Sequence, residues 1–183
     1  EGMRCAVSGS GNVAQFAAKK LLAFGAKVIT ISDSSGVLLF ERGMTEDDWK
    51  VVMDCKNVQR GRLSSIVDKV SGAKYFAGES PWSVDIPYDL ALPCATQNEI
   101  RKEGAMLLVK NGVLGLFEGA NLPTDLEAQE VIRGSKKVIY VPGKASNAGG
   151  VGVSGLEMSQ NAQRLTWKEQ EGDQKLQDMM AGI

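Results

Sequence analysis

The sequence predicts an α/β fold with a mostly parallel, doubly wound sheet that carries helices on both faces. Short apolar or β-branched segments alternate along the chain with longer segments whose apolar residues recur at helical spacing. A glycine-rich run stands between the first strand segment, residues 3–7, and the first helical segment, and reads Ser8-Gly9-Ser10-Gly11-Asn12-Val13-Ala14. Strand, glycine turn and helix in this order are typical of the first unit of a Rossmann-like fold.

The small residues of this run have distinct physical uses. Gly9 permits the tight turn from strand to helix, Gly11 lets a phosphate approach the backbone, and Ala14 keeps the helix close to the sheet. The free N–H groups and the positive dipole end of the helix then favour an anion. Glycine-rich turns also begin helices for steric reasons alone, so the rest of the chain has to decide between the two interpretations.

The following segments complete one strand-helix-strand unit and then repeat it. The first helix is expected to end at Gly25, and the β-branched segment 27–32 to form a buried strand closed by Asp33. Asp33 stands roughly 20 residues beyond the glycine motif, where such folds place an acid that faces the adenosine ribose. Further strands are predicted at residues 74–76, 89–92, 114–117 and 138–141, and further helices at residues 63–70, after residue 124 and from about residue 151.

Two pairs of residues match the capping-box pattern that opens helices. Thr45 with Asp48 predicts a helix that runs to about Cys55. Thr96 with Glu99 predicts a second helix, which runs toward Asn111.

Composition narrows the function. The chain has 183 residues, of which 43% are hydrophobic and 23% charged, with a net charge of −1, so one globular domain with no overall attraction to nucleic acid or membrane is expected. Histidine is absent, which removes Ser-His-Asp and Cys-His catalysis and the commonest metal ligand. We therefore expect neither a metal site nor a hydrolase.

The cysteines and the ends of the chain suggest where it works. Cys5, Cys55 and Cys94 form neither a metal motif nor a disulfide framework, which favours a reducing compartment. No membrane-spanning run or signal peptide is evident, so the cytoplasm is the expected location. The chain begins at Glu1-Gly2 without a methionine and enters its first strand almost at once, so we expect a piece of a longer protein.

Open α/β sheets bind ligands beyond the carboxyl ends of their strands, which predicts where the site lies. The loops expected there are rich in small and uncharged hydrogen-bonding residues, suited to a ligand that bears hydroxyls and an amide. They are Gly9-Ser10-Gly11, Ser32-Asp33-Ser34-Ser35, Cys94-Ala95-Thr96-Gln97, Gly119-Ala120-Asn121 and Asn147-Ala148-Gly149-Gly150.

At these loops the chain resembles the coenzyme-binding domain of hexameric glutamate dehydrogenases, most closely the microbial NADP-using type. The resemblance runs from Gly2 to about Lys168. Its most specific segments are Val7-Ser8-Gly9-Ser10-Gly11-Asn12-Val13-Ala14-Gln15, Leu92-Pro93-Cys94-Ala95-Thr96-Gln97-Asn98-Glu99, Glu118-Gly119-Ala120-Asn121-Leu122-Pro123-Thr124 and Asn147-Ala148-Gly149-Gly150-Val151, which continues to Ser154-Gly155-Leu156-Glu157-Met158.

The resemblance implies oxidative deamination of L-glutamate to 2-oxoglutarate and ammonia, with NADP as hydride acceptor. It assigns the pyrophosphate to the backbone of Gly11, Asn12 and Val13 and to the Asn12 side chain, in a coenzyme-binding turn that includes Gly9 and Ser10. It assigns Ala95, Thr96 and Gln97 to the nicotinamide ribose. It assigns Asn121 to the ribose or carboxamide, Asn147 to nicotinamide and substrate, and Ser154 to the distal carboxylate of glutamate. Each has a purely structural alternative: Thr96 and Ser154 as helix-terminal residues, and Asn121 as a turn residue.

The choice between NADP and NAD depends on the end of the second strand. A carboxylate at Asp33 favours a ribose 2′-hydroxyl and repels a 2′-phosphate. Against this, Ser32, Ser34 and Ser35 can donate hydrogen bonds to phosphate, and Lys56 matches a basic position of the NADP-using enzymes. We therefore expect NADP, with NAD as the alternative.

The resemblance also predicts what the chain lacks. In the family, the catalytic lysine and aspartate belong to a substrate domain that precedes this one, so we expect no catalytic residue here.

One dinucleotide-binding domain is expected over residues 1–183, with a Rossmann core at 1–150 and the start of a hinge helix at 151–183. This piece should bind coenzyme without turnover, as a monomer, while the whole enzyme is a homohexamer. The alternatives are a leucine or phenylalanine dehydrogenase, or a non-catalytic nucleotide sensor on the same fold.

Overall fold

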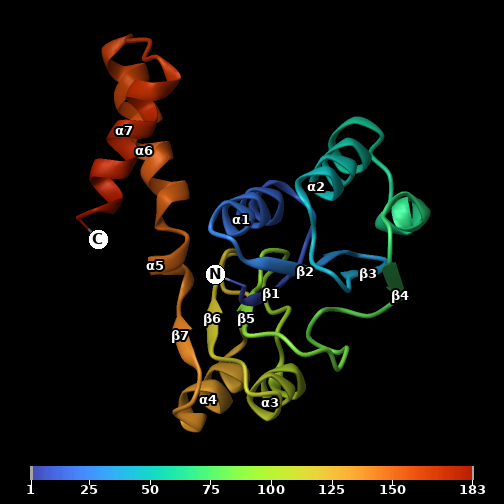
Figure 1. The fold of residues 1–183 in the computed structure, drawn as a ribbon. Coiled ribbons are helices and arrows are strands. Elements are labelled where there is room, and N and C mark those ends of the chain that lie inside the picture. Colours follow the sequence, from blue (N-terminus) through green and yellow to red (C-terminus); the bar gives the residue numbers. More distant parts are fainter. Residues whose placement is uncertain (1, 183) are drawn as a thin grey trace.

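The computed structural model describes residues 2–182, and a single mixed sheet runs through its centre (Figure 1). Its strands are β1 (Arg4–Val7), β2 (Lys27–Asp33), β3 (Gly36–Phe40), β4 (Ala73–Ala77), β5 (Leu90–Leu92), β6 (Gly115–Phe117) and β7 (Ile139–Val141). They lie in the order β4-β3-β2-β1-β5-β6-β7. The strand β3 runs in the direction opposite to all the others, so its pairs with β2 and β4 are antiparallel and every other pair is parallel. The predicted doubly wound, mostly parallel α/β fold is therefore confirmed.

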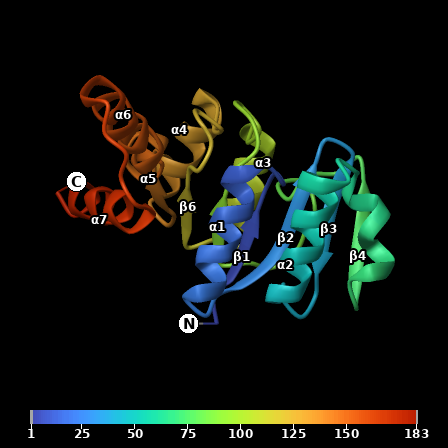
Figure 2. The ribbon, with the colours of Figure 1, turned by 90° about the horizontal axis from the view of Figure 1, so that it is seen from above.

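Helices cover both faces of this sheet (Figure 2). The helical segments of the described residues are α1 (Asn12–Ala23), α2 (Glu46–Met53), a π-helical turn η1 (Asp54–Val58), a 3₁₀ segment η2 (Leu63–Lys69), α3 (Lys102–Lys110), α4 (Leu126–Ser135), α5 (Gly143–Ser146), α6 (Ala148–Gln163) and α7 (Glu169–Met180). None of the helices between residues 2 and 182 is long and apolar enough to cross a membrane.

Each face of the sheet has its own buried core. Helices α3 and α4 pack on one face through residues such as Leu108 and Ile132, and α1, α2, η1 and η2 pack on the other through Ala14, Val52 and Ile66. Both cores are built from alternating strand residues and one stripe of each helix. The chain thus buries two apolar layers of its own.

Several local predictions are confirmed. Gly25 follows α1 with a φ of +73°, and Asp33 is the last residue of β2. Thr45 and Asp48 form the predicted capping box: Thr45 Oγ1 accepts from Asp48 N, and Asp48 Oδ2 accepts from Thr45 N. The helix that this box opens continues into the π-helical turn η1 as far as Val58.

Three local features differ from the expectation. Strand β3 was not predicted; it forms a hairpin with β2 across Ser34 and Ser35. The helix expected from Thr96 begins only at Lys102: Glu99 accepts from Thr96 N, but the reciprocal bond to the Thr96 hydroxyl is not formed, and Glu99 also holds Ala95 and Trp82. The C-terminal helical segment is interrupted after Gln163, and α6 and α7 form a helical hairpin that stands away from the sheet (Figure 1).

Candidate functional site

The glycine turn after β1 lies between the ends of β2 and β5. Gly9 has a φ of +81°, and a Cβ on it would lie 2.9 Å from the carbonyl oxygen of Cys94. Its N–H donates to Ser32 Oγ at 2.8 Å, and its carbonyl accepts from Ser32 N at 3.1 Å. Ser8 Oγ in turn accepts from Cys94 N at 2.9 Å. Gly9 is thus required by the packing of three strand ends.

Gly11 differs from Gly9 because its surroundings are open. It is the exposed N-cap residue of α1, with a φ of −81°, and a Cβ built on it would meet no atom within 4 Å. The first turn of α1 contains no acidic residue, and no side chain caps its N–H groups. This end of α1 offers free donors and a positive dipole end to an anion that approaches the backbone closely.

A buried amide connects the glycine turn to the π-helical turn η1. Gln15, 1% exposed, donates from Nε2 to the carbonyl of Ser10 at 2.7 Å and to Asn57 Oδ1 at 3.1 Å. Asn57 returns a hydrogen bond to Gln15 Oε1 at 3.1 Å. π-helical turns are rare and recur at functional sites. The turn η1, which carries Asn57 and its neighbour Lys56, is therefore a candidate part of the site.

The carboxylate of Asp33 at the end of β2 is fully engaged within the protein. Oδ1 accepts from Ser35 N at 2.9 Å and from Ser35 Oγ at 2.6 Å, and Oδ2 accepts from Leu63 N at 2.9 Å. Lys56 Nζ lies 3.3 Å from Oδ2 and also donates to the carbonyl of Gly61 at 2.9 Å. Beside them, Arg62 Nη1 donates to the exposed Ser34 Oγ at 2.5 Å.

These contacts decide the charge of Asp33. Burial alone would raise its pKa, but the hydrogen bonds from Ser35 and Leu63 and the positive charge of Lys56 outweigh burial and hold the pKa below its ordinary value. Asp33 is therefore an ionised carboxylate, and the cation beside it compensates its charge.

The loop after β5 is fixed by one glutamate. Glu99 Oε1 accepts from Ala95 N at 3.0 Å and from Thr96 N at 3.3 Å, while Oε2 accepts from Trp82 Nε1 at 2.8 Å. Ala95, Thr96 and Gln97 remain exposed at the edge of the sheet. The predicted capping pair is thus only half formed, and the carboxylate holds the loop instead of opening a helix.

The loops after β6 and β7 meet at Asn147. Its Nδ2 lies 3.2 Å from each of three acceptors, the carbonyls of Gly119 and Ala120 and Oδ1 of Asn121. Gly119 N and Ala120 N donate to the carbonyl of Pro93 at 3.0 and 2.9 Å, which joins this pair of loops to the loop after β5. The loops singled out in the sequence therefore form one connected edge.

The predicted residues fall into groups by position. The exposed or half-exposed ones on this edge are Gly11, Asn12, Val13, Ser34, Lys56, Ala95, Thr96, Gln97, Asn121 and Asn147, and Asp33 lies among them with its side chain buried. Ser10 and Ser32 are buried supports of the turn. Ser154 is exposed on α6, where its Oγ donates to the carbonyl of Gly150 at 3.4 Å, so it lies on the helix that leads away from the sheet.

Sequence reasoning missed three supporting side chains, Gln15, Glu99 as a loop anchor, and Glu118. Glu118 is 2% exposed and accepts hydrogen bonds from Tyr140 and Gly143. The sequence did contain a signal for Glu118: an acid stands directly after the apolar strand segment 115–117 and before a glycine. An acid at the end of a buried strand needs hydrogen-bonding partners in the fold.

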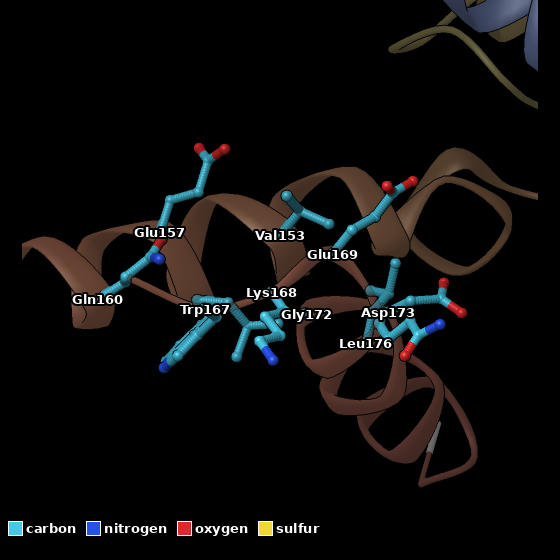
Figure 3. A pocket seen from close by; sticks show the side chains of 11 residues that line it. Val153, Glu157, Gln160, Trp167, Lys168, Glu169, Gly172, Asp173 and Leu176 are labelled. Atoms are coloured by element: carbon cyan, nitrogen blue, oxygen red, sulfur yellow. The ribbon is translucent and has the colours of Figure 1, made fainter. Parts of the chain in front are cut away.

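Two cavities of the described residues stand out, and the glycine turn lines neither of them. The larger, about 750 Å³, lies between α6 and α7 and is lined by residues such as Val153, Trp167 and Leu176 (Figure 3). The smaller, about 420 Å³, includes Asn121, Asn147 and Lys144. Among residues 2–182, no cluster of three or more His, Cys, Asp or Glu side chains could hold a metal.

The fold and its connected loop edge define a Rossmann-like α/β domain. The chain belongs to the glutamate/leucine/phenylalanine/valine dehydrogenase family, whose sequence model matches residues 1–183. It is 49% identical over 183 residues to the NADP-specific glutamate dehydrogenase of Salmonella typhimurium, and it is likewise 49% identical to that of Giardia intestinalis. The chain spans 40% of the length of each.

Solved structures agree with these relatives. Glutamate dehydrogenase 2 of Plasmodium falciparum matches with a TM-score of 0.89 and 49% identity over 98% of this chain and 39% of its own. The L-tryptophan dehydrogenase of Nostoc punctiforme, at 18% identity and a TM-score of 0.57, shares the fold over 99% of this chain and 43% of its own.

Proposed function

We propose that the chain is the coenzyme-binding domain of an NADP-dependent glutamate dehydrogenase, which converts L-glutamate, water and NADP to 2-oxoglutarate, ammonia and NADPH. The observation that carries the proposal is the open backbone at Gly11, at the N-terminus of α1, in the middle of one connected edge of uncharged loops. The NADP-specific glutamate dehydrogenases at 49% identity support the choice of coenzyme and substrate.

The coenzyme would lie along this edge in an order that follows from the fold. The pyrophosphate would meet the backbone of Gly11, Asn12 and Val13 at the N-terminus of α1. The adenosine half would extend toward the end of β2, and the nicotinamide half toward the loops after β5, β6 and β7, because the two nucleotides bind on opposite sides of the switch point between β1 and β5.

The environment of Asp33 supports NADP over NAD. Both carboxylate oxygens accept hydrogen bonds inside the protein, so Asp33 has little capacity left for the 2′- and 3′-hydroxyls of the adenosine ribose of NAD. Lys56 offsets its negative charge, and the exposed Ser34 hydroxyl and Arg62 guanidinium beside it are suitable donors to a 2′-phosphate.

The chain's own residues would bind and orient, while NADP supplies the hydride acceptor when bound. Asn147 uses its amide hydrogens on loop acceptors and keeps Oδ1 as an acceptor, and Asn121, which accepts at Oδ1, keeps its amide as a donor. Such a pair suits the carboxamide of nicotinamide or a ribose hydroxyl. Ser154 would meet the distal carboxylate of glutamate.

We assign residues 1–150 to the Rossmann core and 151–183 to the beginning of the hinge. The substrate domain with the catalytic groups would belong to another part of a longer polypeptide, which would assemble as a homohexamer. The 183-residue chain alone would then bind NADPH but not oxidise glutamate, and its assembly can be measured by light scattering after size-exclusion chromatography.

Calorimetric titration of the chain with NADPH and NADH tests the proposal. We expect saturable binding of NADPH and weaker binding of NADH, and no glutamate-dependent reduction of NADP. Failure of the folded chain to bind either nucleotide would overturn the coenzyme assignment, and turnover by the chain alone would overturn the assignment of catalysis to another domain. A full-length protein that oxidised leucine or phenylalanine in preference to glutamate would change the substrate.

A further inference from the structure

Glu118 is a carboxylate buried at the end of β6, and it connects that strand to the next one. It is 2% exposed, and its Oε1 accepts from the Tyr140 hydroxyl while its Oε2 accepts from Gly143 N, both at 2.8 Å. Its carbonyl accepts from Ser146 Oγ at 2.5 Å. Within residues 2–182 no Lys or Arg forms an ion pair with it.

A buried charge without a counter-ion is expensive and therefore calls for a structural or functional reason. Here the carboxylate accepts from two different elements at once, from β7 through Tyr140, its middle residue, and from α5 through Gly143, its first residue. The guanidinium of Arg133 lies 5.1 Å from the centre of the Tyr140 ring, in a cation-π contact. Together these contacts define the turn between β7 and α5.

This turn determines where Asn147 lies. The carbonyl of Gly143 accepts from Asn147 N at 2.9 Å, and a Cβ on Gly143 would lie 3.1 Å from Asn147 Nδ2 and 3.5 Å from Glu118 Oε2. Gly143 is thus packed between the two side chains. If Glu118 released Gly143, Asn147 would lose the backbone anchor that aims its amide at the loop after β6.

We infer that Glu118 is a positioning residue, acting through Gly143 to orient Asn147 and Asn121 for the nicotinamide half of the coenzyme; the inference rests on the proposed function. Both oxygens of the carboxylate are used on Tyr140 and Gly143, so its part is to position its neighbours. By holding Gly143 it holds Asn147 where its amide donates to Asn121 Oδ1, which leaves Asn147 Oδ1 to accept and the Asn121 amide to donate.

Comparison of a whole coenzyme with its adenosine half tests this inference. Adenosine 2′,5′-bisphosphate has no nicotinamide, so a defect confined to the loops after β6 and β7 should not alter its binding. We expect Glu118→Ala to weaken NADPH binding about tenfold or more, and adenosine 2′,5′-bisphosphate binding by less than about twofold. The fluorescence of bound NADPH should also shift toward that of the free coenzyme.

Conservative variants keep the test decisive if Glu118→Ala folds poorly. In Glu118→Gln the carbonyl can still accept from Gly143 N and the amide can donate to Tyr140 Oη, so NADPH affinity should be restored to within about threefold of wild type. Tyr140→Phe removes one hydrogen bond with no loss of ring packing and should weaken NADPH binding about threefold. Glu130→Ala, at an exposed site on α4, is the matched control.

Thermal unfolding of each variant separates folding from positioning. Equal losses for NADPH and for adenosine 2′,5′-bisphosphate, or an unchanged NADPH affinity in Glu118→Ala and Tyr140→Phe, would overturn the positioning role while leaving the proposed function in place. If the folded wild-type chain bound neither compound, the proposed function would fail first and this inference with it.

Discussion

Lys56 Nζ lies 3.3 Å from Asp33 Oδ2, so the acid that closes β2 carries its own cation at the place where Rossmann-like domains present a free acid to ribose. The pair is largely sequestered, with the Asp33 side chain 5% and the Lys56 side chain 19% exposed. Removing one partner therefore alters the charge that a 2′-phosphate would meet.

The first prediction concerns coenzyme choice. Lys56→Ala leaves Asp33 negative and uncompensated, so it should weaken NADPH binding about tenfold or more and NADH binding by less than about threefold. Parallel calorimetric titrations measure both affinities, with Lys110→Ala at the exposed end of α3 as a control. If Lys56→Ala bound NADPH as tightly as wild type, and its NADH affinity were also unchanged, Lys56 would have no role in the selection of NADP.

The second prediction concerns pH. Asp33 has a pKa below its ordinary value of 3.8, so its contacts stabilise the fold fully above that value and are lost as the pH falls through the lowered pKa. At pH 7, Asp33→Asn should lower the free energy of unfolding by about 1–3 kcal/mol. This difference should shrink below pH 4.

Denaturant unfolding at several pH values measures that difference. Asp68→Asn, at an exposed position of η2, should show little effect throughout. A gap between wild type and Asp33→Asn that stayed constant down to pH 2 would contradict an ionised Asp33 in the fold.

The third prediction concerns the cysteines. All three are free and buried, and burial together with the charge of a nearby acid raises the pKa of Cys5 to about 11 and that of Cys94 to about 12. The native chain should therefore resist iodoacetamide at pH 8, whereas the unfolded chain should take up one adduct per cysteine, as mass spectrometry can count. Rapid labelling of Cys94 in the native chain would mean that the loop after β5 opens.

Much of the fold was predictable because short-range signals specify it. The glycine turn, the capping box at Thr45 and the β-branched strand before Asp33 each depend on neighbouring residues, and all three are present. The hairpin strand β3 departs from the alternation of strands and helices, because it follows β2 directly across Ser34 and Ser35. The helix expected at Thr96 begins six residues later, at Lys102, and Glu99 also bonds to Trp82, a partner that no local pattern contains.

The candidate site shows the same division. Its position at one sheet edge follows from strand order, which alternating segments predict. The internal pairing of Asp33 with Lys56 and Leu63, and of Glu118 with Tyr140, joins residues far apart in the sequence. The spacing of residues in the sequence shows that Asp33 and Glu118 are present at strand ends. It does not show that their carboxylate oxygens accept hydrogen bonds from other residues of the protein.

The last prediction separates the two glycines of the turn. Gly9→Ala places a Cβ 2.9 Å from the carbonyl of Cys94 at a φ of +81°, so it should lower the free energy of unfolding by about 1–3 kcal/mol. Gly11→Ala meets no atom within 4 Å at a φ of −81°, so stability should change by less than about 1 kcal/mol.

Gly11→Ala, the variant that should keep its stability, is the one that we expect to lose affinity for the coenzyme. The new methyl group of Gly11→Ala stands where the pyrophosphate would approach the backbone, so NADPH affinity should fall about tenfold or more in a chain that melts like wild type. Thermal unfolding and NADPH titration of both variants measure the two effects. If Gly11→Ala bound NADPH as tightly as wild type, the phosphate would not rest on this turn, and the open space at Gly11 would serve only the entry into α1.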